Sequence, residues 1–347
     1  MKEILPEVER WLEDGEPVVV ATVVATRRSA PRPVGSSLAV SGSGALCGSV
    51  SGGCVESDVY DKAQEVFGSG LPQLVTYGIS DDEAWSVGLP CGGEIDVFVE
   101  RSDGAARLAP PEDGRAVLFT VLEGEEAGRK LLVVEGGVTT GDGPAALAEL
   151  ADEVLRGGRN RLLELDGARV FAEWYGPPPR LLVYGAVDTA EALCKATKLL
   201  GWHTIVADAR ARFATPERIP SADELIVAWP EETLAQVAPD HQTAIVVLTH
   251  DDKFDEPALI GALQTDAFYI GALGSRRNQE RRRERLLEAG VDEDDLERIS
   301  GPCGLDIGAD TQEETAFSIL TEILAVRAGR SGGRLEGSPQ RIHAEAQ

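Results

Sequence analysis

From residue 180 onward, apolar stretches of strand length alternate with stretches of helical periodicity in this 347-residue chain. Such alternation is typical of parallel strands joined by right-handed crossovers. The sequence therefore predicts a Rossmann-like, doubly wound parallel sheet in a domain spanning residues 180–328. Strands are expected at 181–184, 204–207, 244–248 and 268–270, and helices at 189–200, 231–237, 257–263 and from Thr311, where Glu314 completes a capping box.

The first half of the chain has a different pattern. Its apolar runs are typical of buried strands, and Ile95, Val97 and Val99 alternate with polar side chains as in a half-buried strand. The helices expected there are the first dozen residues and a stretch beginning near Val55. The sequence predicts an N-terminal mixed α+β domain over residues 1–175, so the whole chain is of the α/β class. Its continuous strand-like runs are residues 18–26 and 116–122.

Two composition changes divide the chain. Prolines at 177, 178 and 179 remove backbone donors and stiffen the segment, so we expect the domain boundary there. Residues 329–347 have too little apolar content to form a core, and we expect a disordered tail.

The overall charge excludes several classes of partner. The chain has 33 Lys and Arg against 59 Asp and Glu, a formal net charge of -26, which repels nucleic acid and anionic lipid. Its apolar runs are too short to span a membrane and its first residues lack a secretory signal pattern, so we expect a cytoplasmic protein. Five scattered cysteines without a CxxC pair argue against a disulfide framework and a structural metal site.

Two loops in the first half place a cysteine beside a pair of glycines. In an isolated loop of this kind, the glycines can simply form a tight turn and the cysteine can pack as a small apolar residue. Two such loops in one domain favour backbone amides that bind an anionic ligand containing sulfur or a metal, with thiolates nearby. The residues concerned are Gly52, Gly53 and Cys54 in one loop, and Cys91, Gly92 and Gly93 in the other.

A second candidate site follows the expected strands of the second half. Ligands of open parallel sheets lie outside the carboxyl ends of the strands. Arg276 and Arg277 begin a helix there and suit a phosphate group, whereas the arginines at 281–285 are expected to pair with glutamates on a solvated face. The candidate ligand-binding residues of this edge are Gly185, Asp208, Arg210, His250, Gly271, Gly274, Ser275, Arg276 and Arg277.

The first loop of that edge partly matches a dinucleotide-binding fingerprint. Gly185 and Ala190 occupy the outer positions, and Asp208 is at the distance expected of a ribose ligand. The middle position is Val187, whose branched side chain obstructs a pyrophosphate. An NAD(P)-dependent oxidoreductase is one alternative, and a tight loop without a ligand is another.

Several stretches of the chain resemble the XdhC family, the accessory proteins that mature xanthine dehydrogenase and related molybdenum hydroxylases. The resemblance implies a protein that binds molybdenum cofactor, shields it, supports its sulfuration by a cysteine desulfurase and inserts it into the apoenzyme. Such a protein is a chaperone and does not turn over a substrate. The matching stretches are SAPRPVGSSLAV, GSVSGGCVES, LPCGGEIDVFVE, PPPRLLVYGA, THDDKFDEPAL, YIGALGSRRN and GLDIGADTQEETAFSILTEILA.

The resemblance also implies roles for particular residues. Cys54 and Cys91 would face the molybdenum or the sulfur being delivered, and the second domain would hold a phosphate or nucleotide portion. The segment GAVDTA departs from the GAGHVA common in the family, with Val187 in place of glycine and Asp188 in place of histidine, which weakens a nucleotide-binding role for this loop. The sequence leaves open the client enzyme, a homodimer, and a third function in which the acidic surface docks a basic partner without a small ligand.

Overall fold

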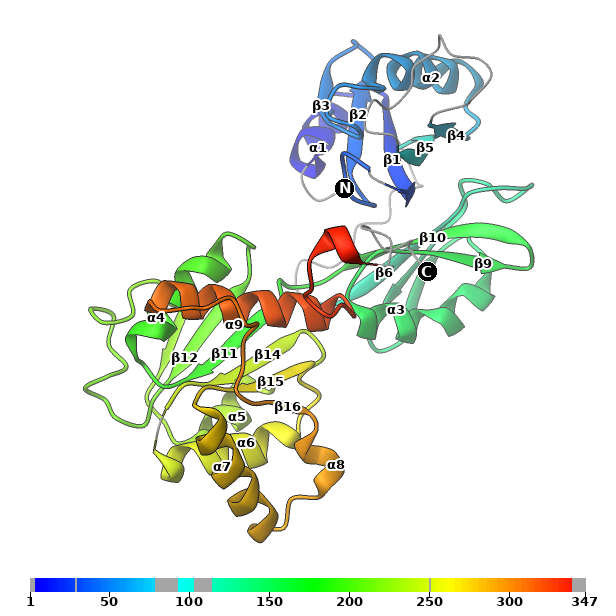
Figure 1. The fold of residues 1–347 in the computed structure, drawn as a ribbon. Coiled ribbons are helices and arrows are strands. Elements are labelled where there is room, and N and C mark those ends of the chain that lie inside the picture. Colours follow the sequence, from blue (N-terminus) through cyan, green and yellow to red (C-terminus); the bar gives the residue numbers. More distant parts are fainter. Residues whose placement is uncertain (1–3, 29, 79–92, 103–113, 250, 339–347) are drawn as a thin grey trace. The chain divides into compact units, whose positions relative to one another are not determined.

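The computed structural model describes residues 4–28, 30–78, 93–102, 114–249 and 251–338. The chain divides into two compact units, which are described separately (Figure 1). Unit 1 comprises Met1–Pro177 with Ser338–Gln347, and unit 2 comprises Pro178–Gly337. Within the described ranges, no helix is both long and apolar enough to cross a membrane.

Unit 1 contains two antiparallel sheets, of which sheet A is formed first along the chain. Helix α1 (Leu5–Glu13) packs against Val18 and Val20 on one face, and helix α2 (Glu56–Ser69) packs against Val19 and Val23 on the other. The alternation arises because successive side chains of a strand point to opposite faces. The strands of sheet A, in spatial order, are β3 (Leu46–Gly48), β2 (Ser37–Ser41), β1 (Val18–Arg27), β5 (Glu94–Arg101) and β4 (Gln73–Tyr77).

Sheet B follows in unit 1 and is also antiparallel. The short 3-10 helix η2 (Ala145–Leu150) and helix α3 (Ala151–Gly157) cover one face, where Leu147 and Val154 pack against Val117 and Phe119. Its strands, in spatial order, are β8 (Val138–Gly141), β7 (Lys130–Val134), β6 (Ala116–Val121), β10 (Ala168–Tyr175) and β9 (Arg161–Leu165).

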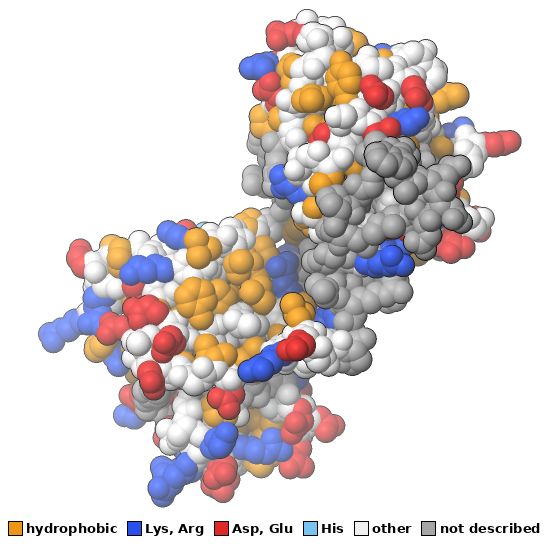
Figure 2. Space-filling model, turned by 45° about the horizontal axis from the view of Figure 1, so that its top comes forward, with side chains coloured by type: hydrophobic (Ala, Val, Ile, Leu, Met, Phe, Trp, Pro, Cys, Tyr) orange, Lys and Arg blue, Asp and Glu red, His pale blue; other side chains and the backbone are white. Residues whose placement is uncertain are grey.

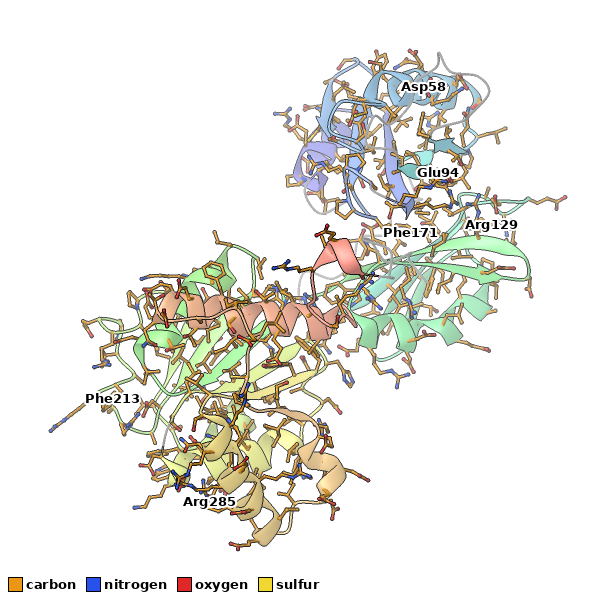
Figure 3. All side chains as sticks on the ribbon, in the orientation of Figure 1. Asp58, Glu94, Arg129, Phe171, Phe213 and Arg285 are labelled. Atoms are coloured by element: carbon orange, nitrogen blue, oxygen red, sulfur yellow. The ribbon has the colours of Figure 1, made fainter. Side chains whose placement is uncertain are left out.

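Alternate side chains of β5 join the two sheets of unit 1. Phe98 packs in one apolar cluster with Phe171 of β10, which Figure 3 labels. On either side of Phe98 the contacts are ionic. The Asp96 carboxylate accepts a hydrogen bond of 2.7 Å from Arg169, and the Glu100 carboxylate accepts one of 2.6 Å from Lys130. Sheets A and B thus share one interface in which buried charges are paired.

Unit 2 is a six-stranded parallel sheet, sheet C, in the order expected of a Rossmann fold, with helices on both faces (Figure 1). Helices α4 (Asp188–Lys198) and α9 (Gln312–Arg327) cover one face. Helices α5 (Pro230–Val237), α6 (Asp252–Leu263), α7 (Arg276–Glu288) and α8 (Glu293–Leu296) lie on the other. Its strands, in spatial order, are β13 (Glu224–Ile226), β12 (His203–Ala207), β11 (Arg180–Tyr184), β14 (Thr243–Val247), β15 (Tyr269–Ala272) and β16 (Ile299–Ser300).

The predicted fold class is confirmed: a mixed α+β part precedes a doubly wound parallel sheet. The capping box of α9 is present, with Thr311 accepting from the Glu314 amide. The separation of the first half into two sheets was not anticipated, because β7 to β9 are short and flank exposed turns. In the expected tail, residues up to Ser338 are described and include the 3-10 turn η3 (Leu335–Gly337), while 339–347 lie outside the described residues.

Candidate functional site

Three loops leave sheet A at the same end. Strands β1, β3 and β4 end there, whereas β2 and β5 begin there, since neighbouring strands are antiparallel. The connecting segments at this end are 28–36, 49–55 and 78–93. The two Cys/Gly/Gly stretches therefore belong to loops that start or finish at one edge of the sheet. Cys91 and Gly92 lie outside the described residues, so the expectation that Cys54 and Cys91 face the same ligand stays a prediction.

The loop that carries Cys54 folds around the carboxylate of Glu56. That carboxylate accepts hydrogen bonds from the amides of Ser51 at 2.9 Å and Gly53 at 2.8 Å, and from the hydroxyl of Ser49 at 2.7 Å. The amide of Gly52 donates to the Ser49 hydroxyl at 2.8 Å. The expected role of these amides in holding an anionic ligand is thus not realised in this conformation, since they already have acceptors within the loop.

The electrostatics of the Glu56 loop favour a permanently charged carboxylate. Burial by itself raises the pKa of Glu56, but hydrogen bonds from Ser49 and Ser51 outweigh it and lower the pKa to about 2. The glycine pair is required for the loop's shape, because Gly52 has φ +75° and Gly53 has φ +110°. The protein's own carboxylate therefore occupies the position that we assigned to a ligand anion.

The thiol of Cys54 remains accessible at the start of α2. Cys54 is exposed, Cys47 is half-buried, and Cys194 and Cys303 are buried. Burial raises the pKa of both Cys194 and Cys303 to about 12, so these two thiols stay protonated near neutral pH. Among the cysteines that the structure describes, Cys54 is the one placed to meet a ligand. Gly93, by contrast, is buried and immediately precedes β5.

A charged network fixes the neighbouring ends of β1 and β5. Arg27 donates to Glu94, which Figure 3 labels, and at 2.8 Å to Asp96, which also accepts from Thr76 at 2.7 Å. The hydrogen bond to Asp96 raises the pKa of Arg27. Arg27 is therefore committed to holding the edge of sheet A, and the loops on either side start from a rigid base.

In unit 2, the backbone amides that follow β11, at residues 185–187, already have hydrogen-bond acceptors within the protein, and we call this segment the closed loop. The amide of Gly185 donates to the carbonyl of Ala207 at 2.8 Å, that of Ala186 to Asp208 at 3.0 Å, and that of Val187 to the Gly185 carbonyl at 3.0 Å. A Cβ at Gly185 would lie 2.7 Å from Cγ2 of Thr249, so the glycine is needed for close packing. Acidic Asp188 follows in the first turn of α4. The amides of Gly185, Ala186 and Val187 thus already have acceptors, and the Asp188 carboxylate opposes an anion at the start of α4.

Asp208 and Arg210 bind each other. The Asp208 carboxylate accepts hydrogen bonds of 2.8 Å from both Nε and Nη2 of Arg210. It also accepts the hydrogen bond from the Ala186 amide. Burial by itself raises the pKa of Asp208, but the hydrogen bond from Arg210 outweighs it and the pKa is lowered. In this arrangement Asp208 does not present its oxygens to a ribose, and Arg210 does not present a free charge to a phosphate.

Two further residues predicted to bind a ligand at this sheet edge are Gly271 and His250. Gly271 lies inside β15, which runs beyond the expected strand end to Ala272, and a Cβ there would meet the ring of Tyr269 at 2.6 Å. Its small size therefore serves packing within the sheet, and its predicted place at the rim is wrong. His250 lies outside the described residues.

The start of α7 is the part of this edge that remains open. Ser275 caps the helix by accepting from the Asn278 amide at 3.2 Å, and the first turn contains no acidic residue. Arg276 and Arg277 are exposed, and Gly274 precedes the cap with φ +145°. A cavity of about 360 Å³ extends from Arg276 along α7, and its other lining residues are Gln279, Glu280, Arg282, Arg283, Leu286, Leu296, Ile299, Gly301 and Pro302.

A buried ion pair holds α7 against α6. Arg282 Nη2 lies 2.8 Å from Asp255 Oδ2, with both side chains almost fully buried. Asp255 also accepts from the Thr249 hydroxyl, and Thr249 packs against Gly185. The pair therefore connects α7 to the closed loop after β11. Arg285 contacts Glu256, as expected, and also Asp252. The expected solvated position is wrong for Arg282, which is buried and pairs with an aspartate.

Aromatic side chains at the same edge were not anticipated. Phe213, Trp229 and Phe254 follow β12, β13 and β14 respectively. The Phe213 and Phe254 rings lie against Arg210, and the Trp229 ring lies against that of Phe254. An aromatic residue shortly after each of three strands that are consecutive in the chain was the available signal. Within the described ranges, no group of three or more His, Cys, Asp or Glu side chains is arranged to hold a metal ion.

Comparison with known proteins covers both units. Residues 181–323 match the profile of the XdhC Rossmann domain, and residues 11–78 match that of the XdhC and CoxI family. Sheet B lies between these two matches. The chain is 31% identical over 329 residues to a Bacillus subtilis protein described as a probable xanthine dehydrogenase component, covering 92% of this chain and 96% of that protein.

Two further relatives have similar extent. The "Molybdenum cofactor insertion chaperone PaoD" of Escherichia coli is 29% identical over 317 residues, which is 91% of this chain and 85% of PaoD. A crystal structure described as a xanthine dehydrogenase from Bacillus halodurans superimposes with a TM-score of 0.65 at 25% identity, covering 96% of this chain and 97% of that one.

Proposed function

Since this chain belongs to the XdhC and CoxI family, we propose that it binds molybdenum cofactor and inserts it into a molybdenum hydroxylase of the xanthine dehydrogenase type. The observation that carries the proposal is the match to a relative named as a molybdenum cofactor insertion chaperone, which extends over 91% of the chain. We infer an accessory chaperone that holds and transfers its ligand without turnover. The NAD(P)-dependent alternative has no support from the comparisons.

The described residues fit the phosphate of such a cofactor at the start of α7. A phosphate needs amide donors and cations, and this turn has an uncharged cap, no acidic residue and two exposed arginines, Arg276 and Arg277. The closed loop after β11 does not fit the same group. We therefore place the phosphate-binding part of the proposed site at Gly274, Ser275, Arg276 and Arg277, rather than at Gly185, Asp208 and Arg210.

Unit 1, considered by itself, has an exposed thiol, Cys54, that suits contact with the metal of the cofactor. Molybdenum cofactor supplies a dithiolene-bound metal, and soft thiolates are compatible neighbours of such a centre. We propose that Cys54 and Cys91 contact the metal or the sulfur during sulfuration, and that a cysteine desulfurase and the apoenzyme are the protein partners. The Glu56 carboxylate holds the Cys54 loop in shape throughout, because its ring of donors stays within the protein.

The test is anaerobic purification of the full chain, with molybdenum measured by mass spectrometry and pterin by fluorescence after oxidation. We expect both to co-purify and to activate a cofactor-free xanthine dehydrogenase. Arg276→Ala with Arg277→Ala should lower the bound pterin at least tenfold, whereas the matched control Arg281→Ala, on the same helix, should not. A wild-type protein that neither retains cofactor nor protects added cofactor from oxidation would refute the proposal.

Cys54→Ser separates sulfuration from binding. We expect near-normal pterin content but a lower yield of sulfurated, active client enzyme, with Cys47→Ser as the half-buried control. Equal client activation by both variants would remove the proposed role of Cys54. Light scattering of the same samples distinguishes a monomer from the homodimer that the sequence leaves open.

A further inference from the structure

Four side chains form a continuous stack at the carboxyl edge of sheet C. The ring of Trp229 lies 4.8 Å from that of Phe254, with an interplanar angle of 33°. The guanidinium of Arg210 lies 5.7 Å from the Phe254 ring and 4.1 Å from that of Phe213. Figure 3 labels Phe213, at the far end of the stack from Trp229.

The stack brings together three separate connections. Phe213 lies in the loop after β12, Trp229 is the N-cap of α5 after β13, and Phe254 is in the first turns of α6 after β14. Ligands of doubly wound sheets lie at this edge. Only 18 Phe, Trp and Tyr residues occur in 347, so three from different loops in one stack are an unusual concentration.

The stack is rigid at its centre and open at one end. The two hydrogen bonds of 2.8 Å from Arg210 to Asp208 orient the guanidinium plane between the rings. Asp208 is in turn held by the Ala186 amide of the closed loop. Trp229, however, retains 49% of its surface in contact with solvent, whereas Trp11 and Trp202 retain 5% each. An indole supported on one side by another ring and open to solvent is suited to receive a further flat group.

The charges of the protein around the stack indicate which class of flat group Trp229 would receive. Acidic and basic side chains are interspersed over the visible face of each unit in Figure 2, and the whole chain carries a net charge of -26. An anionic ligand therefore needs a local attraction that does not depend on net charge. Stacking supplies it for a planar heterocycle, while the open start of α7 at the same sheet edge supplies cations for a phosphate.

We propose that Trp229, supported by Phe254, Arg210 and Phe213, is a stacking platform for a flat nitrogen heterocycle that bears a phosphate, either a pterin or a nucleobase. The inference rests on the proposed function, in that the heterocycle is part of the cofactor carried. It gives the Asp208–Arg210 pair a structural role: the pair positions the stack and does not contact the phosphate. Trp229 is then a binding residue, and Arg210 a positioning residue.

The full chain is titrated with pterin-6-carboxylate in one arm and with CMP and GMP in another, and calorimetry measures the affinity for each ligand. Trp229→Ala should weaken binding of the favoured ring about fivefold or more, because loss of one base–aromatic stack has an effect of this order. Trp229→Phe retains a ring and should restore most of the affinity. Leu199→Ala, which removes an apolar side chain that is 82% exposed on unit 2, is the control and should bind as the wild type does.

The results of this titration test the stacking role of Trp229 separately from the proposed function of the whole chain. Pterin binding that depends on Trp229 identifies the pterin as the stacked group, and nucleotide binding that depends on Trp229 identifies the base. Equal affinity of wild type and Trp229→Ala for every ring, or no binding of any ring, overturns the platform, even if molybdenum co-purifies. Trp229-dependent ring binding by a protein that retains no molybdenum cofactor would instead contradict the proposed function alone.

Discussion

Replacing Glu56 by glutamine tests the loop geometry around Cys54 most directly. The carboxylate accepts from the amides of Val50, Ser51, Gly53 and Val55, and from the hydroxyls of Ser49 and Ser51. A glutamine in its place keeps one acceptor oxygen and directs an NH₂ group toward donors. We expect Glu56→Gln to destabilise unit 1 and to loosen the turn that contains Gly52 and Gly53.

The size of the effect follows from the pKa of Glu56. Its decrease from 4.5 to about 2 would be equivalent to about 3 kcal/mol for a fully buried group. Because the side chain is partly exposed to solvent, we expect about 1–2 kcal/mol at pH 7. The pKa is lower in the folded protein, so the stabilisation is complete above pH 4.5 and is lost as the pH falls toward about 2.

The assay is urea unfolding of wild type and variant at several pH values between 7 and 3. Glu65→Gln is the matched control, since Glu65 lies on the same helix but is exposed, and its replacement should change the free energy of unfolding little. We expect the difference between wild type and Glu56→Gln to shrink as the pH falls, while that of the control stays small. A Glu56→Gln protein as stable as the control at pH 7, or a difference independent of pH, would refute the reasoning.

Three other perturbations probe the rest of the site. Arg282→Ala leaves Asp255 charged and buried, so we expect a loss of about 3–5 kcal/mol in urea unfolding, against less than about 0.5 kcal/mol for the exposed Arg283→Ala; equal losses would contradict the buried pair. Gly185 has a φ of +106°, and a Cβ added there would lie 2.7 Å from Thr249, so Gly185→Ala should lower the free energy of unfolding by about 2–4 kcal/mol. Gly53→Ala is the control and should lower it less, because there is open space around an added Cβ. A larger loss for Gly53→Ala than for Gly185→Ala would argue against close packing at Gly185. Cys54→Ser should remove one rapidly reacting thiol in a dithiobis(nitrobenzoate) titration at pH 8, whereas Cys194→Ser should change only the count after unfolding, because burial raises the pKa of Cys194 to about 12; rapid reaction of Cys194 in the native protein would contradict this.

The sequence predicted the local structure of one candidate site better than that of the other. The open start of α7 agrees with the expectation, because a serine cap followed by two arginines defines a local structure. The loop of Gly52 and Gly53 does not, since the Gly53 amide donates to a carboxylate that comes after it in the chain and the Gly52 amide donates to the Ser49 hydroxyl. Glu56 was visible in the motif, yet nothing in the spacing showed that it turns back on Gly53.

The amino-acid sequence by itself determined the unit 2 fold and the family, because strand–helix alternation and capping residues act over a few neighbouring positions. The tertiary structure decided which polar groups are free. The Ala186 amide donates to Asp208, and Gly185 packs against Thr249, because chain segments distant in sequence meet at one sheet edge. The same convergence created the Trp229 stack from three loops, since the geometry of a sheet edge depends on strand order and not on any local pattern.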